Sequence, residues 1–196
     1  KVRELCPLPK TSYELNIIAK VLKADKGQSL YLRERATETM VKKVKLNDSK
    51  VIAFATHGLL SMETRKLGSV VEPALVLTPP DKATEEDDGL LTASEIAQLR
   101  MDADFVILSA CNTAAGEEGN AEGLSGLAKA FFYAGARSLL VSHWPVESKA
   151  ATKLTTTLFK NLKDNPNLSR AEAFRRSMMS LASVLETSHP FFWAPF

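Results

Sequence analysis

The fold is decided by the stretch Phe105-Val106-Ile107-Leu108-Ser109-Ala110-Cys111-Asn112-Thr113. Four consecutive large apolar residues predict a strand that is buried on both faces. The strand then delivers a cysteine to its carboxyl end, where open α/β sheets bind and process ligands. A second run, Val51-Ile52-Ala53-Phe54-Ala55-Thr56, leads into His57-Gly58 in the same way. If the two strands are parallel neighbours, about 4.8 Å apart, the thiol and the imidazole meet.

The composition excludes several classes of protein. The chain has 196 residues, is 45% hydrophobic and 24% charged, and carries a formal net charge of +2. So small a charge gives no reason to expect binding to nucleic acid or to an anionic membrane. No apolar run reaches the roughly 18 residues of a spanning helix, and no signal peptide is visible.

Cys6 and Cys111 are the only cysteines. Two cysteines make a poor disulfide framework, which favours a reducing cytoplasm. They also lack paired zinc-ligand spacing, so we expect neither a metal site nor a cofactor. The chain begins with Lys1 and stops at Phe196 inside an apolar run that looks like the start of a strand. We therefore expect residues 1–196 to be a single domain, a portion of a longer chain cut before its last strand.

Apolar strands alternate with amphipathic helices along the chain. This order predicts an α/β fold with a mostly parallel sheet and helices on both faces. Besides the two strands above, a buried strand is expected over 138–142, and weaker candidates cover 29–32 and 75–77. Helices are expected over 11–23, 37–44, 92–99, 124–135, 151–162 and 169–185, with capping boxes at Thr11–Glu14, Thr92–Glu95 and Ser169–Glu172. The acidic run 85–88 is expected to be a solvated loop.

Cys111 and His57 are the candidates for a catalytic pair. A free cysteine titrates near pH 8.5, so a nearby histidine or helix N-terminus must favour the thiolate. His57 on the neighbouring strand and the helix beginning near Leu124 offer both. Gly58 has no Cβ, which lets its backbone N–H approach a substrate carbonyl oxygen closely, and the N–H of Cys111 is the natural second donor.

Other interpretations stay open on spacing alone. A cysteine at a strand end is more often a small buried apolar residue, and Cys6 has no catalytic context at all. His143 also follows a strand and competes with His57 as a base, but no glycine follows it. His189, before Pro190 near the end, ranks last. A zinc site of Cys111 with two histidines has no local ligand pair.

Several motifs, in order along the chain, resemble the CHAT domain. They read Ala55-Thr56-His57-Gly58, Asp88-Gly89-Leu90-Leu91-Thr92-Ala93-Ser94-Glu95-Ile96, Leu108-Ser109-Ala110-Cys111-Asn112-Thr113, Glu122-Gly123-Leu124, Phe131-Phe132-Tyr133-Ala134-Gly135-Ala136, Ser142-His143-Trp144-Pro145-Val146 and His189-Pro190 with Trp193 and Phe196. CHAT domains are caspase-like, separase-related cysteine proteases, often attached to tetratricopeptide repeats. The resemblance runs from about Leu8 to the last residue, with His143 where the family usually has leucine.

This resemblance implies a three-layer caspase–haemoglobinase fold with His57 as general base and Cys111 as nucleophile. It also implies an oxyanion hole from the backbone of Gly58 and Cys111. The expected function is cysteine endopeptidase activity through an acyl-enzyme, regulated by attached repeats or a partner. The expected partners are a protein or peptide substrate and a repeat domain or regulatory protein, with no nucleic acid and no membrane.

The sequence also offers candidates for substrate binding. Ser142, Trp144, Glu122 and Glu147 are candidates for substrate binding, and the glutamates suggest an acidic pocket that prefers a basic residue. Asp102 and Asp104 start the cysteine strand, at the wrong end to contact a substrate side chain. Two further function classes remain open: a non-catalytic or latent protein-interaction module of the same fold, and a thiol hydrolase acting on a small amide.

Overall fold

The computed structural model describes residues 2–6, 8, 10–67, 71–109, 126–144 and 147–196. The chain divides into two compact units. The sheet unit comprises Lys1–Pro7 and Tyr31–Pro145, and the helical unit comprises Leu8–Leu30 and Val146–Phe196. Each unit is described by itself.

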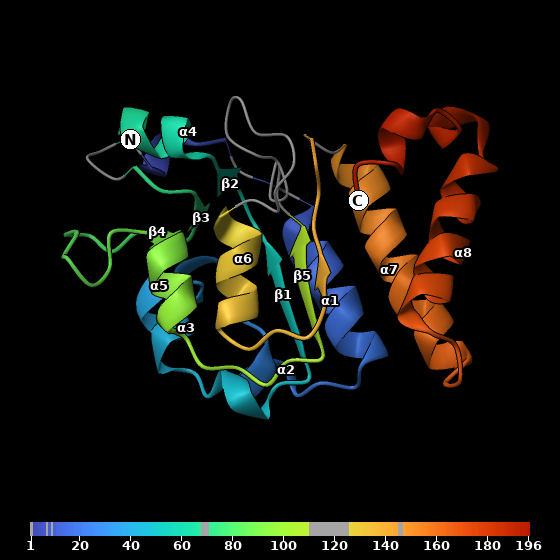
Figure 1. The fold of residues 1–196 in the computed structure, drawn as a ribbon, viewed down its shortest axis with the longest axis horizontal. Helices are drawn as coiled ribbons and strands as arrows, with labels where there is room; N and C mark the ends of the chain where they lie inside the picture. Colours follow the sequence, from blue (N-terminus) through green and yellow to red (C-terminus); the bar gives the residue numbers. More distant parts are fainter. Residues whose placement is uncertain (1, 7, 9, 68–70, 110–125, 145–146) are drawn as a thin grey trace. The chain divides into compact units, whose positions relative to one another are not determined.

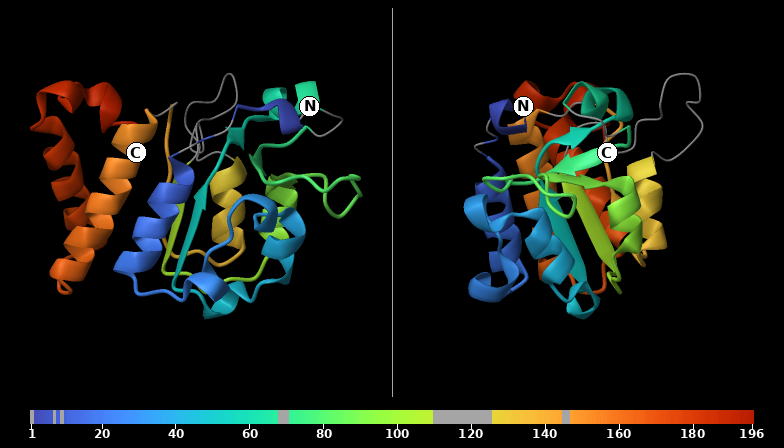
Figure 2. Two further views of the ribbon diagram at one scale, coloured as in Figure 1. Left: turned by 180° about the vertical axis from the view of Figure 1, so that it is seen from behind. Right: turned by 90° about the vertical axis from the view of Figure 1, so that its left-hand side faces the viewer.

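A parallel sheet forms the centre of the sheet unit. Its strands are β1 (Val51–Ala55), β5 (Phe105–Ser109) and β6 (Leu139–Leu140), in the order β1-β5-β6. Figures 1 and 2 show β1 and β5 side by side. The register pairs Val51 with Phe105 and Ala55 with Ser109, so the two strands end level with each other. The prediction that these strands are parallel neighbours is confirmed.

A second, smaller sheet follows β1 directly. It is antiparallel and consists of β2 (Gly58–Leu59), β3 (Ala74–Val76) and β4 (Leu90–Thr92), in that order. Only β3 corresponds to a strand candidate in the sequence, because it overlaps the apolar run 75–77.

Helices pack on both sheets of the sheet unit. In the sheet unit they are α3 (Glu38–Lys43), α4 (Ser61–Leu67), α5 (Ala93–Gln98) and α6 (Gly126–Tyr133), with 3-10 turns at Val2–Glu4, Arg33–Arg35 and Leu46–Asp48. Alternate strand residues such as Ile52, Val106 and Leu108 form one core with Phe131 of α6 and Ile96 of α5. This arrangement, a parallel sheet flanked by helices, is the α/β class that the sequence predicts.

Gly135 ends α6 as the sequence predicts. Its φ of +110° lies in the left-handed region, and a Cβ there would collide with the carbonyl oxygen of Met101. The amide of Ala136 donates to the carbonyl of Phe131 at 3.0 Å, which closes the last turn of the helix.

The helical unit contains α1 (Thr11–Val21), α2 (Lys26–Ser29), α7 (Ser148–Asp164) and α8 (Arg170–Ala182), with 3-10 turns at Leu185–Thr187 and Pro190–Phe192. Its core is formed by Ala150, Leu154 and Leu181, against which Phe174 and Trp193 pack. The segments Leu8–Leu30 and Val146–Phe196 therefore build one unit although they are far apart in the chain.

The three predicted capping boxes can be compared with the helix caps in the structure. Thr92 and Glu95 form the expected capping box at α5, and Ser169 caps α8 by accepting from the amide of Glu172. The box at Thr11 is wrong: Lys10 is the N-cap of α1, and Glu14 is buried. Glu14 instead accepts from Thr155, a contact that local spacing cannot reveal.

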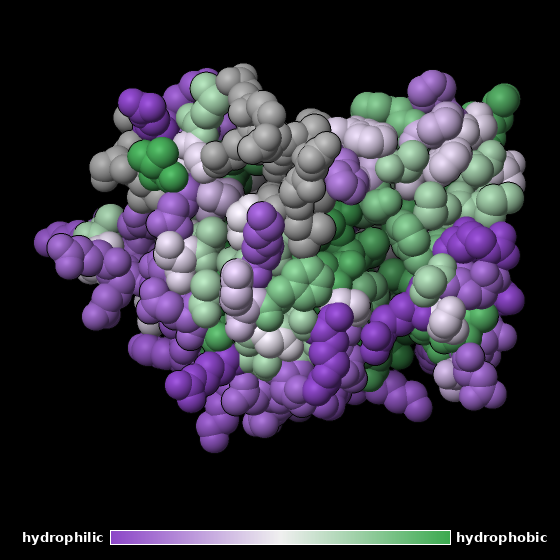
Figure 3. Space-filling view, in the orientation of Figure 1, coloured by the Kyte–Doolittle hydropathy of each residue, from purple (hydrophilic) through white to green (hydrophobic). Residues whose placement is uncertain are grey.

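Three further expectations are wrong. Residues 29–32 form no strand, because the short helix α2 occupies 26–29 and an extended segment follows. The apolar run before Phe196 starts with a 3-10 turn at Pro190–Phe192 instead of a strand. The acidic run 85–88 is not all solvated: the loop is hydrophilic where it projects from the surface (Figure 3), but Asp87 is buried.

Candidate functional site at the carboxyl ends of the parallel strands

The backbone of His57 lies between the two sheets. β1 ends at Ala55, and the hydroxyl of Thr56 donates to the carbonyl of Val76 in β3. The amide of Val76 in turn donates to the carbonyl of His57 at 2.9 Å. The two contacts hold the main chain at His57 against β3, just beyond the end of β1.

The His57 imidazole is held by a backbone carbonyl. Its Nε2 lies 2.7 Å from the carbonyl oxygen of Cys6. A carbonyl oxygen only accepts hydrogen bonds, so Nε2 must carry the proton in this contact. In the neutral ring, Nδ1 is then the nitrogen with a lone pair, and it is the atom available to accept a proton.

The amide of Gly58 is directed away from β3. Gly58 is buried and lies opposite Leu75 in the antiparallel pair of β2 and β3. The bond from the Val76 amide to the His57 carbonyl flanks this pair, which makes Gly58 and Leu75 a non-hydrogen-bonded pair. In such a pair the N–H groups of both residues point away from the partner strand.

Ser109 is the last described residue at the end of β5, opposite Ala55. Cys111 and Glu122 lie outside the described residues. The predicted meeting of the Cys111 thiol with the His57 imidazole therefore stays a prediction, as does the second oxyanion donor at Cys111.

The other candidates fall in different places. Ser142 is buried just after β6, and His143 beside it is exposed. Trp144 is half-buried, and its indole Nε1 is buried without an acceptor among the described residues. In the helical unit, Glu147 caps α7 by accepting from the amide of Ala150 at 2.8 Å, and His189 accepts from the amide of Phe191.

The amino end of β5 carries an ion-pair cluster. Asp102 pairs with Lys50 at 3.1 Å and with Arg137, which also pairs with Asp104 at 2.5 Å. The hydrogen bond from Lys50, followed by the charge of Arg137, lowers the pKa of Asp102. As the sequence predicts, these aspartates lie at the end opposite His57.

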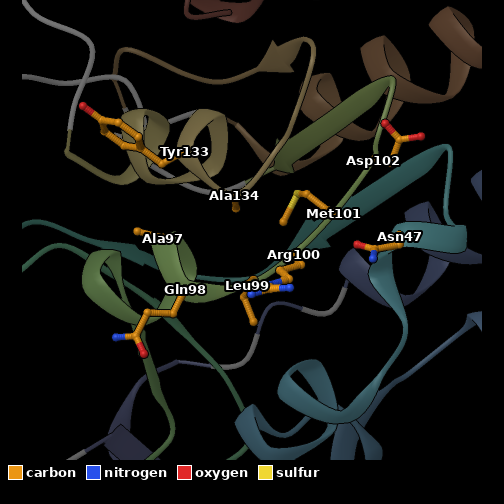
Figure 4. Close-up of a pocket in the computed structure, with 9 residues that line it drawn as sticks. All are labelled: Asn47, Ala97, Gln98, Leu99, Arg100, Met101, Asp102, Tyr133 and Ala134. Carbon is orange, nitrogen blue, oxygen red and sulfur yellow. The ribbon is translucent and has the colours of Figure 1, made fainter.

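A surface hollow of about 690 Å³ lies at that same end (Figure 4). Its lining comes from Asn47, Ala97, Gln98, Leu99, Arg100, Met101, Asp102, Tyr133 and Ala134. Asn47 precedes β1 and Met101 precedes β5, so the hollow is remote from the carboxyl ends of the strands. It has no part in the candidate site.

Neither a metal site nor a membrane-spanning helix is present in the part of the chain that the structure describes. Within residues 2–109, 126–144 and 147–196, excepting the few undescribed positions among them, no three His, Cys, Asp or Glu side chains are grouped to hold a metal ion. Over the same part of the chain, no helix is long and apolar enough to cross a membrane.

The Cys6 carbonyl is a group that the sequence does not indicate among the described residues of the site. Every residue carries a backbone carbonyl, so nothing in the residue type of Cys6 marks it. The only hint is Pro7, which biases Cys6 towards an extended conformation.

Fold and site together define the class: an α/β protein whose parallel strands end level, with a histidine–glycine pair just beyond one of them. The chain belongs to the CHAT domain family, which matches residues 4–196. The observed arrangement is compatible with the caspase-like fold of this family.

Two relatives bear the same name in different organisms. Tetratricopeptide repeat protein 28 of Mus musculus is 26% identical over an alignment of 214 residues, covering 97% of this chain and 8% of the relative. Tetratricopeptide repeat protein 28 of Homo sapiens is 31% identical over 107 residues, covering 55% of this chain and 4% of the relative. The chain thus spans less than a tenth of either relative. Their names agree with the expected association of CHAT domains with tetratricopeptide repeats.

Proposed function

We propose that this chain is a cysteine endopeptidase that hydrolyses peptide bonds of a protein substrate through a Cys111–His57 dyad. The observation that carries the proposal is the register of β1 and β5. Ala55 of β1 is paired with Ser109 of β5. His57 comes two residues after Ala55 in the sequence, and Cys111 comes two residues after Ser109. Parallel neighbours of equal length deliver such residues to one edge of the sheet.

The proposed reaction passes through an acyl-enzyme. His57 accepts the thiol proton at Nδ1, and the Cys111 sulfur attacks the carbonyl carbon of the scissile peptide. The imidazolium then protonates the leaving amine, and water releases the acyl group with His57 again acting as base. The Cys6 carbonyl supports this role, because its bond with Nε2 selects the tautomer in which Nδ1 is basic.

The oxyanion would be bound by the amides of Gly58 and Cys111. The orientation of Gly58 supports this, because its N–H is directed away from β3 and is not used in that ladder. Each donor of this kind typically contributes a factor of about 10² to 10³ in rate.

Substrate contacts are proposed for Ser142, Trp144, Glu122 and Glu147. Ser142 and Trp144 follow β6, whose parallel pairing with β5 brings them towards the same edge as His57. A preference for a basic residue before the scissile bond rests only on the two glutamates. If a peptide library is cleaved preferentially after Asp or after a small apolar residue, the proposed preference for a basic residue is wrong.

The other candidate is a latent or non-catalytic interaction module. The names of both relatives refer to tetratricopeptide repeats, and an association with such interaction repeats supports this alternative. In either case we propose a tetratricopeptide repeat region of a longer chain, or a separate regulatory protein, as the partner. Cytoplasmic location remains a proposal from the low cysteine content.

Proteolysis tests the proposal. Candidate substrate proteins are co-expressed with the chain, with Cys111→Ala and with His57→Ala. We expect cleavage products only with the native chain, since either substitution removes one half of the dyad. Products of equal amount from Cys111→Ala would exclude the peptidase. Binding of the same protein by all three forms, without cleavage, would support the interaction module.

A further inference from the structure

The N-terminal strap, residues 2–6, belongs to the sheet unit although the segment that follows it does not. Leu8–Leu30 is part of the helical unit, and the chain returns to the sheet unit only at Tyr31. The strap begins with a 3-10 turn at Val2–Glu4 and ends at Cys6, whose carbonyl contacts His57. The contacts of the strap therefore decide where that carbonyl lies.

Apolar packing joins the strap to the small antiparallel sheet. Val2 and Leu5 pack against a buried cluster formed by Ala74 and Val76 of β3 with Leu90 of β4. Val76 is also the residue whose amide binds the His57 carbonyl. One strand thus supports both partners of the contact between Cys6 and His57.

Arg3 provides the polar anchor of the strap. Its Nη2 donates to the carbonyls of Pro80 at 2.8 Å and Pro79 at 3.3 Å, and to Oδ1 of Asp81 at 3.2 Å. The Asp81 side chain is fully exposed, and its ion pair with Arg3 therefore contributes little to the stability of the strap. The two carbonyls are main-chain acceptors of the segment that leaves β3.

The segment that receives Arg3 is held in place. Thr78 donates from its amide to the carbonyl of Ala36 at 2.9 Å and from its hydroxyl to the carbonyl of Arg33 at 2.7 Å. Gly89 has a φ of +87°, and a Cβ there would lie 2.7 Å from Cβ of Pro79. The acceptors of Arg3 consequently lie on well-supported backbone.

We propose that Arg3 is a positioning residue: it anchors the strap so that the Cys6 carbonyl holds the His57 ring with its proton on Nε2. The catalytic consequence rests on the proposed function, because it concerns the base that activates Cys111. The ring contact itself does not, because it lies wholly among described residues. Loss of the anchor frees the strap end and lets the ring exchange tautomers.

Nitrogen NMR of the imidazole tests the anchor without any activity. The chain has three histidines, so the His57 signals can be assigned by comparison with His57→Ala. In the native chain we expect a single tautomer protonated at Nε2. In Arg3→Ala the chemical shifts of His57 Nε2 and Nδ1 should move towards the average of the two tautomers. Arg3→Lys keeps a positively charged donor and should restore part of the difference between the two chemical shifts.

Arg137→Ala is the matched control. Arg137 is an exposed arginine of the same unit that binds Asp102 and Asp104 at the other end of the sheet. Its removal should leave the His57 shifts unchanged. Equal His57 spectra for Arg3→Ala and the native chain would overturn the proposal, as would equal changes in Arg3→Ala and Arg137→Ala.

The rate of alkylation by iodoacetamide tests the consequence for Cys111. All variants are made in a Cys6→Ala background, so that Cys111 is the only thiol. Adding Arg3→Ala should lower the rate near neutral pH about fivefold, the factor expected for one exposed hydrogen bond. A faster rate would mean that the strap obstructs His57 and would overturn the proposal. If His57→Ala leaves the rate unchanged, the dyad fails, and the NMR result alone decides the role of Arg3.

Discussion

Glu38 places a carboxyl group inside the sheet unit with only 1% of the residue exposed. Oε2 accepts from the amides of Asp88 at 3.0 Å and Gly89 at 3.2 Å, and Oε1 accepts from Lys42 at 2.6 Å. Burial outweighs the Lys42 bond and raises the pKa of Glu38 from 4.5 to about 7. In Glu95, which shares Lys42, burial is outweighed by hydrogen bonds from Lys42 and Thr92, so its pKa is lowered.

Glu38 makes the stability of the protein depend on pH. Because its pKa is raised by folding, its stabilising effect is complete below pH 4.5 and is lost as the pH rises through about 7. The loss amounts to about 3 kcal/mol, from about 1.4 kcal/mol for each tenfold change in the proton equilibrium. Glu38→Gln cannot titrate, so its free energy of unfolding should fall less between pH 4.5 and 8, measured by urea unfolding.

Glu34→Gln is the control for this prediction. Glu34 is an exposed glutamate in the turn before α3, so its substitution should leave the pH profile of the native chain unchanged. If Glu38→Gln and the native chain lose stability equally over this range, the Glu38 carboxyl does not titrate as described.

At the scale of one element, α3 begins with a cap from a distant loop. Thr37 supplies the local cap that the sequence predicts, by accepting from the amide of Met40. Asp87 adds a second cap: its Oδ2 accepts from the amide of Thr39 at 3.0 Å and from the Thr39 hydroxyl at 2.5 Å, across 48 positions of the chain. A carboxylate at this end also complements the helix dipole.

Asp87→Ala should therefore destabilise the protein by about 1–2 kcal/mol, because it leaves the partly buried amide and hydroxyl of Thr39 without this acceptor. Chemical denaturation measures the change. Glu85→Ala, in the same loop but exposed, should stay within about 0.5 kcal/mol of the native chain. Similar losses in both variants would show that the loop as a whole, and not the cap, is responsible.

At the scale of the whole molecule, one bond links the two segments of the helical unit. Thr155 of α7 donates to Oε1 of Glu14 in α1 at 2.8 Å, and the two buried side chains are 141 positions apart in the chain. The same hydroxyl oxygen lies 3.0 Å from the carbonyl oxygen of Ala151 in its own helix. A buried carboxylate needs such donors, since unpaired polar groups in a core are costly.

Thr155→Val keeps the shape of the side chain and removes the donor to Glu14. We expect a loss of about 1–2 kcal/mol in the free energy of unfolding. Thr156→Val is the matched control, because the hydroxyl of Thr156 bonds only to carbonyls of its own helix, at Thr152 and Lys153. A loss in the control as large as that in Thr155→Val would refute a specific role for Glu14.

The sequence by itself determined the parallel strands 51–55 and 105–109, the α/β class and the caps at Thr37, Thr92 and Ser169. These features depend on neighbours within one strand or one helical turn, where periodicity and residue type carry the information. Only the tertiary structure decided the level ends of β1 and β5, the Cys6 carbonyl at His57, and the burial of Asp87 and Glu14. Each of these joins residues about 50 or more positions apart, and such contacts follow from the packing of whole elements, which no local pattern records.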